Sequence, residues 1–236
     1  MAIEINLLDI DTAAIQMKLA ANEICSVDLV AAYLEQIHQH SLKGALLRAL
    51  ISLEDLRPKE PFHGIPIIIK DNIPTNSSLG MPTTYGTAAL IDAYGGQNRD
   101  VVDLVLKAGM IILGKANLSM SSASSKPIPR TRGVGRLLEG KAFPSPAGSS
   151  SGSAVSVAAR FAPIALGTET DGSLVQPAPQ AGLYALKPAP GKVSVNSSLG
   201  GFLCASIEPI AKSSKDVADL LSLLMGTDLA HALKGS

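Results

Sequence analysis

Two glycine- and serine-rich segments of this chain could supply a serine nucleophile for acyl chemistry. The first is GSSSGS at 148–153, and the second is GTETDGS at 167–173. Small residues let the backbone turn sharply and aim several N–H groups at one point. Such N–H groups stabilise the negative oxygen that forms when a nucleophile attacks an acyl carbon. The two segments therefore predict acyl transfer from a serine hydroxyl.

A serine hydroxyl needs a base, and histidine is the usual one. The chain has four histidines: His38, His40, His63 and His231. The first two fall on a helical pattern and the last in a polar tail, and His63 precedes a predicted strand. We expect a structural role for His63. This expectation disfavours a Ser–His–Asp triad but does not exclude one.

Lysine can replace histidine as the base when burial lowers its pKa, because a desolvated ammonium gives up its proton more readily. Lys70 follows three isoleucines at 67–69, which are typical of a buried strand. Taken alone, a lysine after an apolar strand fits an edge or ion-paired residue better than a base. The residue types therefore leave both Lys70 and His63 open.

Alternating strand and helix patterns are expected to position these residues. Apolar spacing predicts two helices within 11–40, joined near 22–25, with Ser26 as the N-cap of the second. An alternation of strands and helices further along indicates an α/β fold. The remaining predicted elements are strands within 63–72 and at 110–114, 164–167 and 183–187, helices at 85–90, 101–107, 154–160 and 217–225, and a solvated loop at 119–153.

The composition limits the kind of protein that this chain can be. Its 236 residues suit one compact domain or a large piece of a bigger one. Apolar residues make up 46% and aromatic residues only 3%, which fits helices packed on a sheet better than a β-sandwich. The net charge of zero gives no reason to expect nucleic acid or an acidic membrane as a partner.

The sequence predicts no metal, cofactor, disulfide or membrane span. Cys25 and Cys204 lie far apart without CxxC spacing, and the histidines and carboxylates show no ligand spacing. The N-terminal stretch lacks the basic residues of a signal peptide, and no apolar run approaches the ~20 residues of a membrane span. We expect a cytoplasmic protein.

Seven short motifs in the correct order resemble the amidase signature family. The resemblance runs from about residue 7 to residue 226, and Ser173 follows Ser149 by 24 positions (173 − 149), as the family pattern requires. Any one motif is moderately specific, but the combination in order is very specific. The motifs are GIP at 64–66, KDN at 70–72, MPTTYG at 81–86, LGKANLS at 113–119, GSSSGS at 148–153, GTETDGS at 167–173 and LYALKP at 183–188.

The resemblance implies a catalytic role for three residues. Ser173 would attack the substrate carbonyl carbon, Ser149 would relay the proton, and Lys70 would be the final base. The reaction implied is hydrolysis of the C–N bond of a small or peptide-like amide through an acyl-enzyme, with no cofactor.

The resemblance also implies a supporting framework. The Gly148–Ser149 peptide bond would be cis, and Ser150 would hydrogen-bond Lys70 or this turn. Asn72 would support the site from the KDN motif. The backbone N–H groups that would form the oxyanion hole are those of Thr170, Asp171, Gly172 and Ser173.

The fold implied is an α/β/α layered core with a mixed, largely parallel sheet. We expect one domain over 1–236, with N-terminal helices at about 11–40 packed outside a catalytic core at about 61–226. The active site would lie at strand ends and glycine turns.

The chain departs from the family pattern in length and in two motifs. The family domain is roughly twice as long, so we expect the half that completes the sheet and walls the pocket to be absent. MSSA at 120–123 stands where the family has acidic and aromatic residues, and LVQP at 174–177 lacks the family's arginine. Two other functions stay open: a weak or inactive homologue acting through a partner, and a glutamine amidotransferase subunit. An exposed sheet edge could be covered by a partner or a second copy.

Overall fold

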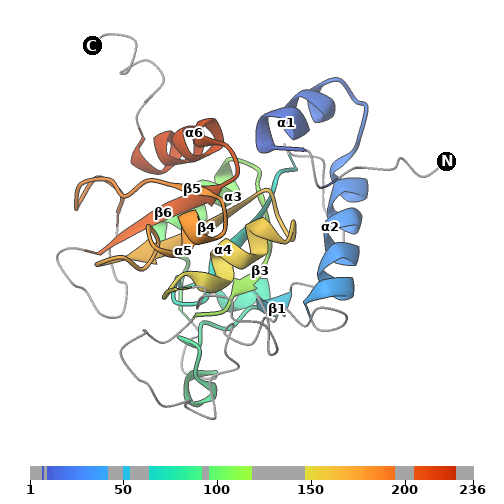
Figure 1. Ribbon diagram of the computed structural model, residues 1–236. Helices are drawn as coiled ribbons and strands as arrows, with labels where there is room; N and C mark the ends of the chain where they lie inside the picture. Colours follow the sequence, from blue (N-terminus) through green and yellow to red (C-terminus); the bar gives the residue numbers. More distant parts are fainter. Residues whose placement is uncertain are drawn as a thin grey trace, which may run out of the picture.

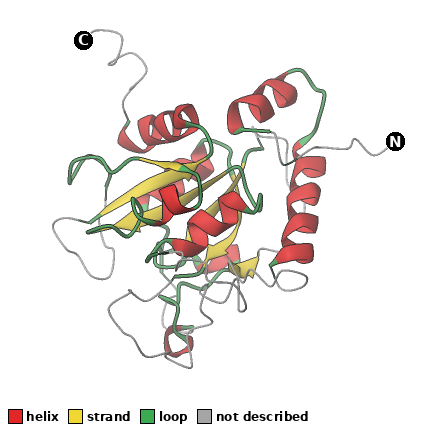
Figure 2. Ribbon diagram, in the orientation of Figure 1, coloured by secondary structure: helices red, strands yellow, loops and turns green. Residues whose placement is uncertain are grey.

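A computed structural model describes a layered molecule built on one sheet (Figures 1 and 2). Residues 119–146 of the loop predicted at 119–153 lie outside the described residues, as do His63, Cys204 and His231. The structure describes residues 7, 10–41, 50–53, 64–91, 96–118, 147–194 and 205–226.

The sheet of the described residues has six strands in the order β1-β3-β2-β4-β6-β5. Strands β3, β2 and β4 run parallel to one another, whereas β1 is antiparallel to β3. Strand β6 is antiparallel to both β4 and β5. Four of the six strands therefore point the same way, which confirms the mixed, largely parallel sheet. The strands are β1 (Leu50–Leu53), β2 (Pro66–Lys70), β3 (Ile111–Ala116), β4 (Ile164–Glu169), β5 (Tyr184–Ala185) and β6 (Ser206–Ala211).

Strand β2 lies in the middle of the sheet and carries Lys70 at its carboxyl end. Its three isoleucines, Ile67, Ile68 and Ile69, have no exposed surface. An unbroken apolar run is what a strand covered on both faces requires. The predicted buried strand ending at Lys70 is therefore confirmed.

Helices cover both faces of the sheet and make the layered α/β/α fold (Figure 1). Helices α4 and α5 lie on one face, and α3 and α6 contact each other on the opposite face. Short 3-10 turns η1 (Ser77–Leu79) and η2 (Ala88–Leu90) lie between β2 and α3. The sheet-covering helices are α3 (Asp100–Lys107), α4 (Ser151–Ala158), α5 (Pro177–Gln180) and α6 (Ser214–Met225).

Two helices, α1 (Thr12–Ala20) and α2 (Ser26–His40), form where the apolar spacing predicted them, and they pack outside this core. The Gln36 side-chain amide of α2 donates to the carbonyl oxygen of Ala159 at 3.0 Å. The backbone N–H of Thr12 donates to the carboxylate of Asp216 at 3.0 Å. These two hydrogen bonds tie the N-terminal pair to the ends of α4 and α6.

Some predicted boundaries were wrong. Ser26 is the first residue of α2, and Cys25 is its N-cap, whose side chain makes no capping hydrogen bond with the helix backbone. Helix α4 begins at Ser151, inside the segment predicted to be loop, because these small serine and glycine residues fit closely against the sheet. The helix predicted at 85–90 is only the 3-10 turn η2.

Strand β6 was not predicted, although it pairs with β4 over six residues. Ser206, Glu208 and Pro209 interrupt its apolar residues. Polar residues and proline are both more typical of loops than of buried strands. All six positions are nevertheless buried. Strand β1 was also not predicted as a strand.

Candidate active site

The ammonium nitrogen of Lys70 lies among four oxygen atoms at the carboxyl end of β2. It is 2.8 Å from Ser149 Oγ and 2.9 Å from Ser150 Oγ. It is also 2.8 Å from Thr168 Oγ1 and 3.2 Å from the Thr168 carbonyl oxygen. These oxygens are all uncharged, and Lys70 itself is fully buried. The hydrogen-bond partners of the Lys70 ammonium group are therefore uncharged hydroxyl and carbonyl groups, with no carboxylate among them.

Burial lowers the pKa of Lys70 from its usual value of 10.5 to about 7. The carboxylates of Glu208 and Glu169 oppose this shift, since negative charge favours the ammonium form, but burial is the larger effect. Near neutral pH, a substantial fraction of Lys70 is therefore the free amine, which can accept a proton.

A neutral amine has two N–H bonds and one lone pair, so it cannot donate to all four oxygens. The Ser150 hydroxyl donates to the Thr168 carbonyl at 3.0 Å, and the Asn72 amide donates to Thr168 Oγ1 at 3.0 Å. These partners orient Ser150 and Thr168 as acceptors for the Lys70 N–H bonds. The Lys70 lone pair can then accept the hydroxyl proton of Ser149.

The two serine-rich segments meet beside Lys70. The backbone N–H of Ser150 donates to the carbonyl oxygen of Ser173 at 2.8 Å. The peptide bond between Gly148 and Ser149 is cis, as the family resemblance implies. Ser149 and Ser173 are both half-buried, so each keeps some exposed surface. The structure thus brings together Lys70, Ser149, Ser150 and Ser173, all of which the sequence singled out.

Gly167 of β4 allows this close approach. A Cβ atom at Gly167 would lie 2.9 Å from Ser150 Oγ and 2.5 Å from Leu174 Cδ1. Contacts this short require the neighbouring groups to move. A residue without a side chain is therefore needed where the start of α4 and the turn after Ser173 both pack on the strand.

The turn at 170–173 presents unpaired backbone donors. Within the described part of the chain, the N–H groups of Asp171, Gly172 and Ser173 donate to no acceptor. Gly172 has a φ of +84°, in the left-handed region that favours glycine. The carbonyl oxygen of Thr170 accepts from Lys187 Nζ at 3.2 Å. Donors left free in this way are what an oxyanion requires.

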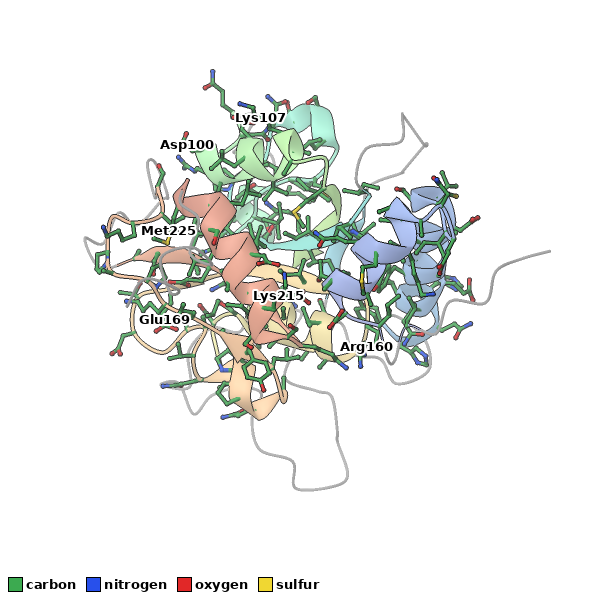
Figure 3. All side chains as sticks on the ribbon, turned by 90° about the horizontal axis from the view of Figure 1, so that it is seen from above. Asp100, Lys107, Arg160, Glu169, Lys215 and Met225 are labelled. Atoms are coloured by element: carbon green, nitrogen blue, oxygen red, sulfur yellow. The ribbon has the colours of Figure 1, made fainter. Side chains whose placement is uncertain are left out.

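Glu169, labelled in Figure 3, fixes the same turn and was missed by the sequence analysis. One of its carboxylate oxygens accepts from the N–H of Leu174 at 2.8 Å and of Val175 at 2.7 Å. Leu174 and Val175 directly follow Ser173, so the buried Glu169 carboxylate fixes the backbone immediately after this serine. A carboxylate among small residues at the end of an apolar strand was the signal that could have revealed it.

A second buried lysine, Lys115, organises the loop that follows Lys70. Its Nζ donates to the Ile73 carbonyl and lies 3.3 Å from Thr83 Oγ1. Burial lowers the pKa of Lys115 to about 8, and Asp71 opposes the shift. The Asp71 carboxylate accepts from the backbone N–H of Gly86 at 2.8 Å. Lys115 and Asp71 therefore hold loop 71–86, and with it the neighbouring Asn72.

The other candidate groups lie elsewhere or do not cluster. His38 and His40 are on α2 rather than on the strands beside Lys70, and the thiol of Cys25 is exposed. Within the ranges that the structure describes, no three His, Cys, Asp or Glu side chains gather as metal ligands. No helix in the described part of the chain combines the length and apolar character needed to cross a membrane.

One family of proteins matches this chain, in which a layered fold places a buried lysine at the end of a strand, hydrogen-bonded to two serines. The model of the Amidase family matches residues 27–233. A "Probable amidase" of Arabidopsis thaliana is 36% identical, over 90% of this chain and 45% of that protein. A glutamyl-tRNA(Gln) amidotransferase subunit of Deinococcus deserti is 32% identical, over 84% of this chain and 43% of that protein. The chain belongs to the amidase family.

Solved structures agree with this assignment. The native peptide amidase of Stenotrophomonas maltophilia superposes with a TM-score of 0.78 at 34% identity, over 98% of this chain and 51% of that one. The expected family and fold class are therefore confirmed. The chain spans about half the length of the relatives that it matches.

Proposed function

We propose that this chain hydrolyses the C–N bond of a small or peptide-like amide, with Ser173 as nucleophile, Ser149 as relay and Lys70 as base. The observation that carries the proposal is the 2.8 Å contact between Lys70 Nζ, fully buried, and Ser149 Oγ. Because burial keeps the pKa of Lys70 near 7, this amine can take a proton that a surface lysine would not.

In the first half of the reaction, Ser173 Oγ attacks the carbonyl carbon of the amide. Its proton passes to Ser149 Oγ, which gives its own proton to the lone pair of Lys70. The new C–O bond leaves a negative charge on the former carbonyl oxygen. The N–H groups of Thr170, Asp171, Gly172 and Ser173 are the donors that we assign to this oxyanion.

In the second half, the C–N bond breaks and the leaving nitrogen takes the proton back from Lys70 through Ser149. The product is an amine or ammonia, and the acyl group stays as an ester on Ser173. A water molecule then attacks the ester, again losing its proton to Lys70. Release of the carboxylic acid restores Ser173, Ser149 and the free amine.

Peptide amides and small amides are the substrates that we favour. The support is the 34% identity to the peptide amidase together with a TM-score of 0.78. A second candidate is an amidotransferase subunit that releases ammonia from glutamine, which the relatives of that kind at 32–34% identity support. A partner-dependent or inactive homologue is the third, because the chain spans about half the length of its relatives.

The test is ammonia release by the purified chain from peptide amides, small amides and glutamine. Ser173→Ala is run beside it, with Ser78→Ala in an exposed turn as the matched control. We expect release from peptide or small amides that Ser173→Ala abolishes and Ser78→Ala leaves unchanged. Release from glutamine alone would favour the amidotransferase, and equal background in all three folded proteins would favour a partner-dependent form.

A further inference from the structure

A buried carboxyl group beside the site, that of Glu208, has no part in the reaction described above. Glu208 lies on β6 with none of its surface exposed, and it pairs directly with Gly167 of β4. The hydroxyl of Ser206 donates to Glu208 Oε1. Glu208 Oε2 has no hydrogen-bond partner among the described residues. A buried, half-satisfied carboxyl needs a physical explanation.

Glu208 and Lys70 lie on the same face of the sheet, on either side of Gly167. Directly paired residues of neighbouring strands point to the same face. A Cβ at Gly167 would point at Ser150 Oγ, which Lys70 Nζ also contacts, so this face is the one that α4 covers. Because Gly167 has no side chain, β4 places no side chain between Lys70 of β2 and Glu208 of β6 on this face.

The surroundings of Glu208 disfavour a second negative charge. The groups that act on it are Glu169, Lys187, Lys70 and the Ser206 hydroxyl. Burial raises the pKa of Glu208 to about 8, and the carboxylate of Glu169 adds to this increase. The Ser206 hydroxyl, Lys187 and Lys70 act in the opposite direction and lower the pKa. Helices α4 and α5, on the same face, carry no titratable side chain, and α6 lies on the opposite face.

We propose that Glu208 is a positioning residue for Lys70: its carboxyl stays protonated in the resting site, and this leaves Lys70 as the free amine. One proton shared between the two groups can sit on the carboxyl, giving two neutral groups, or on the amine, giving an ion pair. Both forms contain the same number of protons. Desolvation penalises two ions more than two neutral groups, so the buried site favours the neutral form.

This inference deepens the proposed function, because a protonated Glu208 keeps the base available. An ionised Glu208 would instead stabilise the Lys70 ammonium and withdraw the base. Replacing Glu208 with glutamine keeps the shape but removes the ion-pair form. The neutral amide then imitates the protonated carboxyl, so Lys70 should titrate as it does beside Glu208 itself.

The test uses carbon-13 NMR titration of the chain labelled at glutamate Cδ and lysine Cε. We expect one glutamate signal to titrate near pH 8, well above the others, and to disappear in Glu208→Gln. The Lys70 signal, assigned with Lys70→Ala, should keep its midpoint in Glu208→Gln, because glutamine is neutral like the protonated carboxyl. Glu35→Gln makes the same substitution on the exposed side of α2 and should leave the raised glutamate signal in place.

The titration does not depend on hydrolysis, so an inactive chain would count against the proposed function alone. A Lys70 midpoint that moves to lower pH in Glu208→Gln would overturn the inference, because it would mean that Glu208 is ionised while Lys70 titrates. If that variant does not fold, the wild-type signals decide: every glutamate titrating in its ordinary range would also overturn it.

Discussion

The backbone N–H of Ser150 donates a 2.8 Å hydrogen bond to the carbonyl oxygen of Ser173. This bond joins the two serine-rich segments at the point where Lys70 contacts Ser149 and Ser150. It fixes the proposed relay and nucleophile on one rigid unit, the end of β4 and the start of α4. Reactive groups that are held in place in this way lose little entropy on reaching the transition state.

The pH dependence of hydrolysis should report Lys70. Burial holds its pKa near 7, below its usual 10.5, so the amine form grows as pH rises through 7. The value of kcat/KM should therefore rise across that range, with an acid limb whose midpoint lies near 7. Initial rates between pH 5 and 9 measure this. A midpoint above pH 9 would show that Lys70 is an ordinary ammonium and not the base.

Lys70→Ala should reduce kcat by about 10²–10⁴-fold, the usual contribution of a positioned general base. The fold should survive, because the change removes a buried amine whose burial is itself unfavourable. Steady-state rates and circular dichroism check the two parts. Lys18→Ala, at an exposed salt bridge on α1, is the control and should leave the rate unchanged. Full activity in a folded Lys70→Ala protein would contradict the mechanism.

Gly167→Ala should disturb the site by overpacking. The new Cβ would meet Leu174 Cδ1 at 2.5 Å and Ser150 Oγ at 2.9 Å. We expect a loss of about 1–3 kcal/mol in unfolding free energy, and reduced activity as the serines move. Urea unfolding measures the first effect. Gly182→Ala, whose Cβ meets nothing within 4 Å, should lose only about 1 kcal/mol through its positive φ and should retain activity.

Glu169→Gln should weaken the turn that carries Ser173. The amide oxygen can still accept from Leu174 and Val175, but the charge that strengthens both bonds is lost. We expect a loss of about 1–2 kcal/mol in stability and a fall in kcat larger than any rise in KM. Glu35→Gln again controls for the charge. A change in KM alone would mean that the turn contacts substrate without positioning the nucleophile.

Lys115→Met should destabilise the protein and loosen loop 71–86. The change leaves the Ile73 carbonyl without its donor and removes the positive charge near Asp71. Loss of one partner from a buried polar network costs about 3–5 kcal/mol. Thermal unfolding measures this, with Lys18→Met on the surface expected to change stability by less than about 0.5 kcal/mol. Equal stability of the two variants would show that the loop does not depend on Lys115.

Strands β2, β3, β4 and β5 could be predicted from the sequence, whereas β1 and β6 could not. Strand β2 is an unbroken apolar run because helices and strands bury it on all sides, so its pattern is clear. Strand β6 mixes Ser206, Glu208 and Pro209 with apolar residues, and only its pairing with β4 makes it a strand. Local pattern carries no information on such pairing when the residues are polar.

The site was predicted in part for a similar reason. Residue type and order indicated Lys70, Ser149 and Ser173, but the base could be chosen over His63 only through the family resemblance. The contacts of Glu169 and Glu208 were missed because buried carboxylates are rare. Their roles depend on which backbone N–H groups and charges the fold brings to them, and this is a property of tertiary structure.

Covalent labelling with a fluorophosphonate tests most directly whether Ser173 is the activated nucleophile. The probe is a phosphorus electrophile that loses fluoride to an activated serine hydroxyl, and peptide mass spectrometry locates the adduct. We expect one adduct, on Ser173, that is absent in Ser173→Ala, forms much more slowly in Lys70→Ala and is unchanged in Ser78→Ala. An adduct on another serine, or equal labelling with and without Lys70, would contradict this expectation.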